Sequence, residues 1–181
     1  MRHARIEIRI GGTGGQGLIL CAKMLADALC ASGKRVAQSQ TYEPTSRGGY
    51  CNSDLVISEC EIDYPLATAL DCLVLLDRMA VKPSWPLLKA GALVLADTRL
   101  CPELPEGNHK VNHRTHHLPL SRTAIELGSE RVANIVALGA LAALSGVCAR
   151  KALEQAVRAD TPKSFLDLNM DALAAGYSLV A

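Results

Sequence analysis

The chain has 181 residues, a length typical of one domain, and we expect residues 1–181 to form a single domain. Its 19 basic and 18 acidic side chains nearly cancel, which gives no electrostatic footprint for nucleic acid or for an anionic membrane surface. Apolar residues make up 49% of the sequence and aromatic residues only 3%, so the core must be aliphatic, as suits layered α/β folds.

The sequence contains no stretch that predicts a membrane span or a secretory signal. No apolar run reaches the roughly 20 residues that a spanning helix needs, and the N-terminal residues lead straight into a strand pattern. We therefore expect a cytoplasmic location. The seven cysteines include no close C-x-x-C pair, so they predict neither a disulfide framework nor a zinc or iron–sulfur site. We expect them to be small buried apolar residues.

Strand and helix patterns alternate along the first half of the chain. Residues 5–10 alternate between polar residues and three isoleucines, which predicts the first strand. Apolar residues at three- and four-residue steps predict a helix over residues 15–32, ended by Gly33. The following elements are strands at residues 35–40 and 50–58, joined by a loop at residues 41–49 that contains Pro44.

The second half of the chain continues with buried strands and ends in helices. Near-continuous apolar runs of strand length occupy residues 71–76 and 92–97, and a helical stretch between them ends at Gly91. A short strand is predicted near residues 110–116, and helices follow at residues 129–144, 149–159 and 167–175. This order predicts a three-layer, Rossmann-like α/β fold with a mostly parallel sheet, helices on both faces and a helical C-terminal part.

The helix predicted at residues 129–144 is apolar almost all round. We expect it to be buried or to cover a partner, which could be a second copy when the chain is isolated. Asn134 is its unusual polar member, and a buried amide needs a hydrogen-bond partner. That partner is expected to be a nearby loop carbonyl or, less often, a group on another chain.

A glycine-rich turn lies between the first strand and the first helix. Gly12, Gly14 and Gly17 match the G-x-G-x-x-G spacing, in which the first glycine allows a sharp reversal, the second a close ligand and the third close helix–strand packing. The unpaired N–H groups and the positive dipole end of the helix would stabilise an anion such as a phosphate here. The turn could equally serve only as a tight strand-to-helix connection.

An ordinary dinucleotide site is disfavoured by the end of the second strand. NAD-binding folds place an acidic side chain about 20 residues past the glycines, where it accepts the ribose hydroxyls. Here the strand at residues 35–40 ends on amides and a hydroxyl, and Glu43 lies beyond it. The sequence therefore lacks the residue that binds the ribose.

Several polar residues admit two interpretations. Gln16 either caps the glycine turn or contacts a ligand. Arg47 follows Ser46 and precedes two glycines, so we expect a functional or interface role instead of a bare surface arginine. Asp77 follows a buried strand, at the edge where active-site residues gather, but we favour a helix-starting aspartate beside a solvated Arg78.

A cluster of histidines lies near the predicted short strand. Its spacing fits neither a helical i, i+4 pair nor a zinc finger, and a strand would send His116 and His117 to opposite faces. We therefore predict no metal site among the four members, which are His109, His113, His116 and His117.

Two loops and the C-terminal segment together resemble one family, the gamma subunit or gamma domain of 2-oxoacid:ferredoxin (acceptor) oxidoreductases. A G-G-Q-G turn followed some thirty residues later by S-R-G-G is far more specific than a glycine fingerprint alone. The matching segments keep the family's order and cover nearly the whole chain, at residues 11–18, 42–49, 53–65, 133–140 and 168–177.

The resemblance implies a subunit of a complex that oxidatively decarboxylates a 2-oxoacid to an acyl-CoA. It implies alpha, beta and delta partner subunits that carry thiamine diphosphate, Mg²⁺ and iron–sulfur clusters, with ferredoxin as the acceptor. This chain has neither the G-D-G…N pattern that holds thiamine diphosphate nor a cysteine set for a cluster, so it is not expected to be catalytic alone. The 2-oxoglutarate type is favoured, with pyruvate, branched-chain and indolepyruvate types close behind.

The resemblance also implies a role in holding coenzyme A (CoA), whose phosphates suit a helix N-terminus and a guanidinium. The expected binding residues come from both loops: Gly12, Gly14, Gly15, Gln16 and Gly17 from the first, and Ser46, Arg47, Gly48 and Gly49 from the second. Two other functions remain open, a pure assembly subunit that binds no ligand and a free-standing nucleotide-dependent oxidoreductase.

Overall fold

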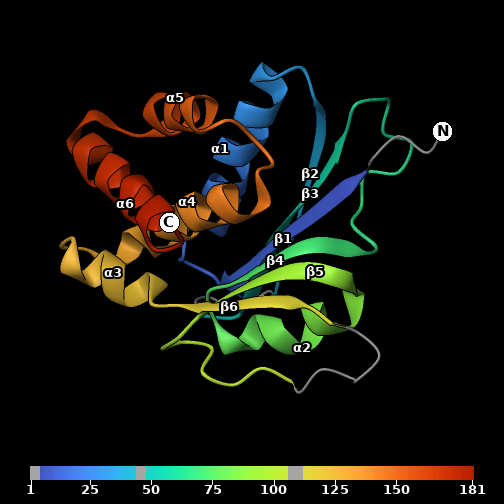
Figure 1. Cartoon of the computed structure of the whole chain (residues 1–181), viewed down its shortest axis with the longest axis horizontal. Coiled ribbons are helices and arrows are strands. Elements are labelled where there is room, and N and C mark those ends of the chain that lie inside the picture. The colour runs from blue at the N-terminus through green and yellow to red at the C-terminus, as the bar shows by residue number, and fades with distance from the viewer. Residues whose placement is uncertain (1–4, 44–47, 106–111) are drawn as a thin grey trace.

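A computed structural model describes residues 5–43, 48–105 and 112–181. Its centre is a six-stranded sheet in the order β2-β3-β1-β4-β5-β6 (Figure 1). The strands are β1 (Ile6–Thr13), β2 (Arg35–Tyr42), β3 (Tyr50–Ser58), β4 (Leu70–Leu75), β5 (Leu88–Asp97) and β6 (Arg114–Leu118).

The sheet is mixed, and only β3 runs against the others. The pairs β1–β4, β4–β5 and β5–β6 are parallel, whereas β3 pairs antiparallel with both β1 and β2. Strand β2 therefore points the same way as β1, so both strands end at the same edge of the sheet. The predicted α/β fold with a mostly parallel sheet is confirmed, and the antiparallel β3 is the departure from a fully parallel order.

Helices cover the two faces unequally (Figure 1). The upper face carries α1, α4, α5 and α6, while the lower face carries, among the described residues, only the short α2, which is flanked by two 3-10 turns. The helix bounds are α1 (Leu18–Ala31), α2 (Val81–Ser84), α3 (Leu120–Glu126), α4 (Ala133–Ser145), α5 (Arg150–Asp160) and α6 (Leu166–Ser178).

Alternation along the strands sends side chains to two separate cores. Cys72 and Val74 join the larger core under α1 and α4, whereas Leu73 and Leu75 join a smaller core with the α2 segment. This two-residue period is the pattern of strands buried on both faces.

Helix α4 lies inside the molecule, as its sequence predicts. Its residues 134–142 are all buried, and α6 packs across it so closely that two glycines face the opposite backbone. A Cβ at Gly139 would meet the Leu173 carbonyl, and a Cβ at Gly176 would meet the Val136 carbonyl. Of the two expected environments for this helix, burial within its own chain is therefore confirmed.

The lower face of β1 carries buried charges that the sequence analysis did not single out. Arg9 is 8% exposed, and its guanidinium donates to both carboxylate oxygens of Asp54 at 2.7 Å. Glu7 is 3% exposed and accepts from the Thr68 and Ala69 N–H groups and from Arg5. Burial would raise the pKa of Glu7, but these hydrogen bonds and the Arg5 charge outweigh it and lower the pKa.

Three predicted elements differ from the structure. The helix expected to end at Gly91 is only a short turn, because Pro83 and Pro86 remove backbone donors, and β5 already begins at Leu88. Strand β6 lies further along the chain than predicted, and residues 110–111 of that prediction lie outside the described residues. Helix α3 was not predicted, since its seven residues are too few for a clear helical period.

The cysteines are all free thiols, and four of the seven are buried. Burial raises the pKa of Cys21 to about 12, so this thiol stays protonated and unreactive at neutral pH. None of the helices in the described ranges is long and apolar enough to cross a membrane.

Candidate functional site

The glycine turn forms where β1 ends and α1 begins. Strand β1 continues through Gly12 to Thr13, so the chain reverses later than the fingerprint predicts. The glycines with positive φ are Gly15 at 101° and Gly17 at 69°, which is the conformation that glycine adopts without strain. The expected role of Gly12 as the reversal point is therefore wrong.

The Gln16 side chain bridges the turn and occupies the space beside Gly12. Its Oε1 accepts from the Thr13 N–H at 2.8 Å, and its Nε2 donates to the Leu76 carbonyl at 2.9 Å. A Cβ at Gly12 would collide with this amide. Of the two interpretations of Gln16, the structure supports the loop-capping one.

The second loop meets the glycine turn at the same edge of the sheet. The Gly14 N–H donates to the Gly49 carbonyl at 2.9 Å, and a Cβ at Gly14 would lie 4.0 Å from the Gly48 nitrogen. The two loops expected to lie together therefore touch. Ser46 and Arg47 lie outside the described residues.

The contact with Gly49 changes which N–H groups could receive an anion. Gly14 and Gln16 donate to protein carbonyls, so they are not free donors. Among the described residues, no acceptor is hydrogen-bonded to the N–H of Gly15 or Gly17. The open N–H groups of the first turn of α1 begin directly after them, at Leu18.

Asn134 holds the end of the turn from α4. Its Nδ2 donates to the Gly17 carbonyl at 3.1 Å, and its Oδ1 accepts from the Ile135 N–H at 2.9 Å. The expectation of a nearby loop carbonyl is confirmed. The thiol of Cys21 donates to the Asn134 carbonyl at 3.3 Å, which ties α1 to the same point.

Gly17 is expected to tolerate no side chain while Asn134 is present. Its φ of 69° strains any other residue, and a Cβ would lie 2.6 Å from Asn134 Nδ2. We expect Gly17→Ala to lower the free energy of unfolding by about 2 kcal/mol in urea titrations, and by about 1 kcal/mol when Asn134 is also alanine.

A matched control for this pair is Gly33→Ala. Gly33 has φ of 82°, and a Cβ there would meet nothing within 4 Å. Its cost should be the same with either residue at position 134, because only strain is involved. Strictly additive effects of Gly17→Ala and Asn134→Ala would contradict the proposed contact.

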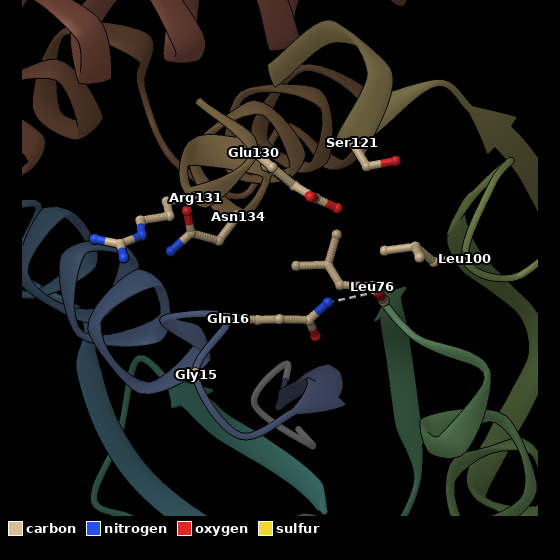
Figure 2. Close-up of a pocket in the computed structure, with 9 residues that line it drawn as sticks. Gly15, Gln16, Leu76, Leu100, Ser121, Glu130, Arg131 and Asn134 are labelled. Atoms are coloured by element: carbon tan, nitrogen blue, oxygen red, sulfur yellow. Dashed lines mark hydrogen bonds between the residues drawn. The ribbon is translucent and has the colours of Figure 1, made fainter. Parts of the chain in front are cut away.

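A cavity of about 210 Å³ opens between the glycine turn and the start of α4 (Figure 2). Its lining includes the apolar side chains of Leu76 and Leu100 and the polar side chains of Ser121 and Glu130. The Gln16 amide points to the Leu76 carbonyl across its floor.

A second cavity of about 410 Å³ lies on the other side of Asn134. It shares Gly15, Arg131 and Asn134 with the first cavity, so the two cavities flank the turn. Its apolar lining comes from α1, from α4 and α6 and from the segments just before these two helices, with Leu20, Val132, Ile135, Pro162, Phe165 and Leu168.

Arg131 is the functional candidate that the sequence analysis missed. It is exposed, lines both cavities, and extends away from Glu130 toward α1 in Figure 2. Within the described ranges, no carboxylate lies in salt-bridge distance of its guanidinium. The only sequence signal was its place after Ser129, whose hydroxyl accepts the Arg131 N–H at the start of the helix.

Two other charged groups beside this cavity already have partners within the chain. Arg99 forms an ion pair with Glu130, and its Nε donates to Ser121 Oγ at 3.0 Å. Asp97 is fully buried and accepts from the N–H groups of Arg99, Leu100 and Ser121. Arg131, which lines both cavities, is therefore a cation positioned to meet an anion at the glycine turn.

The remaining candidates have structural explanations. Asp77 accepts from the Met79 N–H at 2.9 Å and so starts a helical turn, as favoured, and Arg78 is exposed. His116 and His117 are adjacent in β6, and His109 lies outside the described residues. No cluster of three metal-ligating side chains occurs in the parts of the chain that the structure describes.

Comparisons with known proteins agree over nearly the whole chain. The family model described as pyruvate ferredoxin/flavodoxin oxidoreductase matches residues 7–179. The 2-oxoglutarate synthase subunit KorC of Methanothermobacter marburgensis is 36% identical over 180 residues, which cover 97% of each chain.

Solved structures give the same result. The gamma subunit of a keto/oxoacid ferredoxin oxidoreductase from Geobacter sulfurreducens has a TM-score of 0.87 and 40% identity, with 98% of this chain and 97% of that chain covered. The 2-oxoglutarate:ferredoxin oxidoreductase of Magnetococcus marinus, with 2-oxoglutarate, coenzyme A and succinyl-CoA bound, has a TM-score of 0.82. At 23% identity over 99% of this chain and 31% of that chain, it shares the fold.

Proposed function

This chain belongs to the pyruvate ferredoxin/flavodoxin oxidoreductase family, and we propose that it is the gamma subunit of a complex that converts 2-oxoglutarate to an acyl-CoA. Family membership confirms the resemblance seen in the motifs. The choice of 2-oxoglutarate is supported by relatives named 2-oxoglutarate synthase subunits, at 36% identity over 97% of the chain. A ketoisovalerate oxidoreductase subunit follows at 30% identity over 77% of the chain.

The redox chemistry belongs to partner subunits in this proposal. Thiamine diphosphate with Mg²⁺ and the iron–sulfur clusters would sit on alpha, beta and delta subunits, and ferredoxin would accept the electrons. The sequence supports this division, because it has no G-D-G…N pattern and no cysteine set for a cluster. Within the complex, this chain would bind CoA and shape the mouth of the active site.

One observation carries the CoA proposal: open backbone donors, a guanidinium and an apolar cavity converge on the glycine turn. The N–H groups of Gly15 and Gly17 and the Arg131 side chain can together receive a phosphate. The adjoining wall holds Phe165, which is 54% exposed, and Leu20, which is 43% exposed. An exposed ring next to a phosphate site suits the adenine or the pantetheine arm of CoA.

The sequence-predicted site is kept and extended in this proposal. Gly15 and Gly17 are the donors, while Gly12, Gly14 and Gln16 shape the turn. Gly48 and Gly49 hold the second loop against it, and Ser46 and Arg47 stay within the proposed site. If Arg47→Ala left the KM for CoA and the assembly of the enzyme unchanged, Arg47 would not be part of the site.

Arg131→Gln is expected to weaken CoA binding about tenfold in calorimetric titrations of the chain, because one charge-assisted contact to phosphate is lost. In the assembled enzyme, the KM for CoA should rise by a similar factor while kcat is unchanged. Pantetheine, which carries no phosphate, should bind the variant and the natural chain equally.

The matched control for Arg131 is Arg122→Gln. Arg122 is also an exposed arginine near a helix, but its Nε donates to Glu126 and it lines neither cavity. Equal losses of CoA affinity in both variants would indicate a general charge effect and contradict a site at Arg131.

Two further titrations test the alternatives. Tight binding of NAD or a flavin would favour a nucleotide-dependent oxidoreductase. No measurable binding of NAD, flavins or CoA would favour a pure assembly subunit. The substrate is tested on the complex, by measuring CoA-dependent ferredoxin reduction with 2-oxoglutarate, pyruvate, branched-chain 2-oxoacids and indolepyruvate. A higher kcat/KM for any of the last three would overturn the 2-oxoglutarate assignment.

A further inference from the structure

Strand β2 is an edge of the sheet that no described part of the chain covers. It pairs on one side with β3, from Arg35 opposite Ser58 to Tyr42 opposite Cys51. Five of its eight residues are exposed, and Tyr42 is 64% exposed. A long edge strand presents unpaired N–H and C=O groups that can join another strand.

The hydrogen bond at the end of β2 shows which backbone groups point outward. Glu43 N–H donates to the Tyr50 carbonyl at 2.9 Å, which makes these residues a hydrogen-bonded pair. In an antiparallel ladder such pairs recur at every second residue, so the odd-numbered residues of β2 bond to β3. The outward groups belong to Val36, Gln38, Gln40 and Tyr42.

The edge lacks the usual features that discourage strand pairing. Natural edges carry lysines, prolines, bulges or inward-pointing charges. Residues 36–42 contain none of these side chains, and their register with β3 is unbroken. Charges occur only at the two ends, where Arg35 and Glu43 are both exposed.

The sequence of β2 is complementary to itself in one antiparallel register. Two copies related by a two-fold axis through Ser39 would place residues of the same sheet face opposite one another. Arg35 then faces Glu43 of the other copy, Val36 faces Tyr42, and Gln38 faces Gln40. Each is a favourable cross-strand pair, and symmetry makes each occur twice.

A neighbouring register is less favourable. An axis through Gln38 would place Arg35 opposite Thr41 and Lys34 opposite Tyr42, so neither cation would meet a carboxylate. The charges therefore select the axis through Ser39.

Helix α1 adds apolar surface beside this axis. The Gln38 side chain donates to the Ile19 carbonyl at 3.0 Å, which places the start of α1 next to the middle of β2. Ile19 is 39% exposed. We propose that two copies of this chain associate through antiparallel pairing of their β2 strands, with Arg35 of each copy paired to Glu43 of the other.

Charge reversal tests both the interface and its register. The 181-residue chain is expected to sediment with twice its mass of 19.2 kDa at micromolar concentration. Arg35→Glu or Glu43→Arg alone should weaken association about tenfold or more, because two attractive pairs become repulsive. An equimolar mixture of the two variants should recover the dimer, since every cross-strand pair is then of opposite charge.

A backbone variant gives an independent test. Gln40→Pro removes an N–H that points to the open edge and leaves the bonds to β3 intact, so the chain should fold and be monomeric. As a charge control, Arg122→Glu changes an exposed arginine on α3 and should leave the mass unchanged. A natural chain that is monomeric at high concentration, or a variant mixture that fails to dimerise, would overturn the proposal.

Discussion

Replacing Asp54 with alanine is expected to lower the free energy of unfolding by about 4 kcal/mol, because it leaves the Arg9 guanidinium buried without a counter-charge. Burial lowers the pKa of Arg9, but the hydrogen bonds and charge of Asp54 outweigh this and raise it, so Arg9 is cationic throughout the accessible pH range. Its other contacts are long, at 3.4 Å to the Pro83 carbonyl and 3.5 Å to Ser84. Urea denaturation measures the loss.

Removal of both charges should cost much less than removal of one. In Arg9→Met with Asp54→Asn, the buried cation is gone and the amide oxygen can still accept from Asn52 Nδ2, which lies 2.7 Å from Asp54. We expect most of the lost stability to return. If the double variant were no more stable than Asp54→Ala, an unpaired buried charge would not be the cause.

Gly176→Val is expected to lower the free energy of unfolding by about 3 kcal/mol, because it forces two packed helices apart. A Cβ at Gly176 would collide with the Val136 carbonyl, a backbone atom that no side-chain rotation can move. Since α4 begins next to Asn134 and Arg131, the same variant should also weaken CoA binding to the folded chain. Urea denaturation and calorimetry measure the two effects.

The control for this variant lies on the same helix. Ala174→Val makes an alanine-to-valine change on the exposed side of α6, so its cost should be only a few tenths of a kcal/mol. Comparable losses at positions 174 and 176 would indicate that helix propensity, and not the α4–α6 contact, sets the cost.

The proposed self-association and the proposed role in a complex use different parts of the molecule. The proposed CoA site lies at the carboxyl ends of β1 and β4, between α1 and α4, whereas the dimer would form along the open edge of β2. The Arg35 and Glu43 variants should therefore leave CoA affinity unchanged, and Arg131→Gln should leave association unchanged.

Local sequence patterns predicted correctly those elements that are buried along nearly their whole length. Residues 50–58, which include the apolar run Leu55, Val56 and Ile57, form β3 with the predicted bounds. The prediction was wrong where a local signal conflicted with the pattern. Leu88 belonged to the helical stretch predicted to end at Gly91, but the two prolines before it limit the helix to one turn.

For the glycine turn, the sequence by itself determined that a strand, a reversal and a helix start lie together, because glycine spacing and apolar periodicity are local properties. It also placed the second loop beside this turn, because loops that follow the carboxyl ends of neighbouring parallel strands lie at one edge of the sheet. The tertiary structure decided which N–H groups stay open and that Gly12 makes room for Gln16. It also brought Arg131 to the turn and left β2 at an edge. The position of Arg131 and the open edge at β2 depend on strand order and on contacts between distant residues, such as Asn134 with Gly17, which no local pattern encodes.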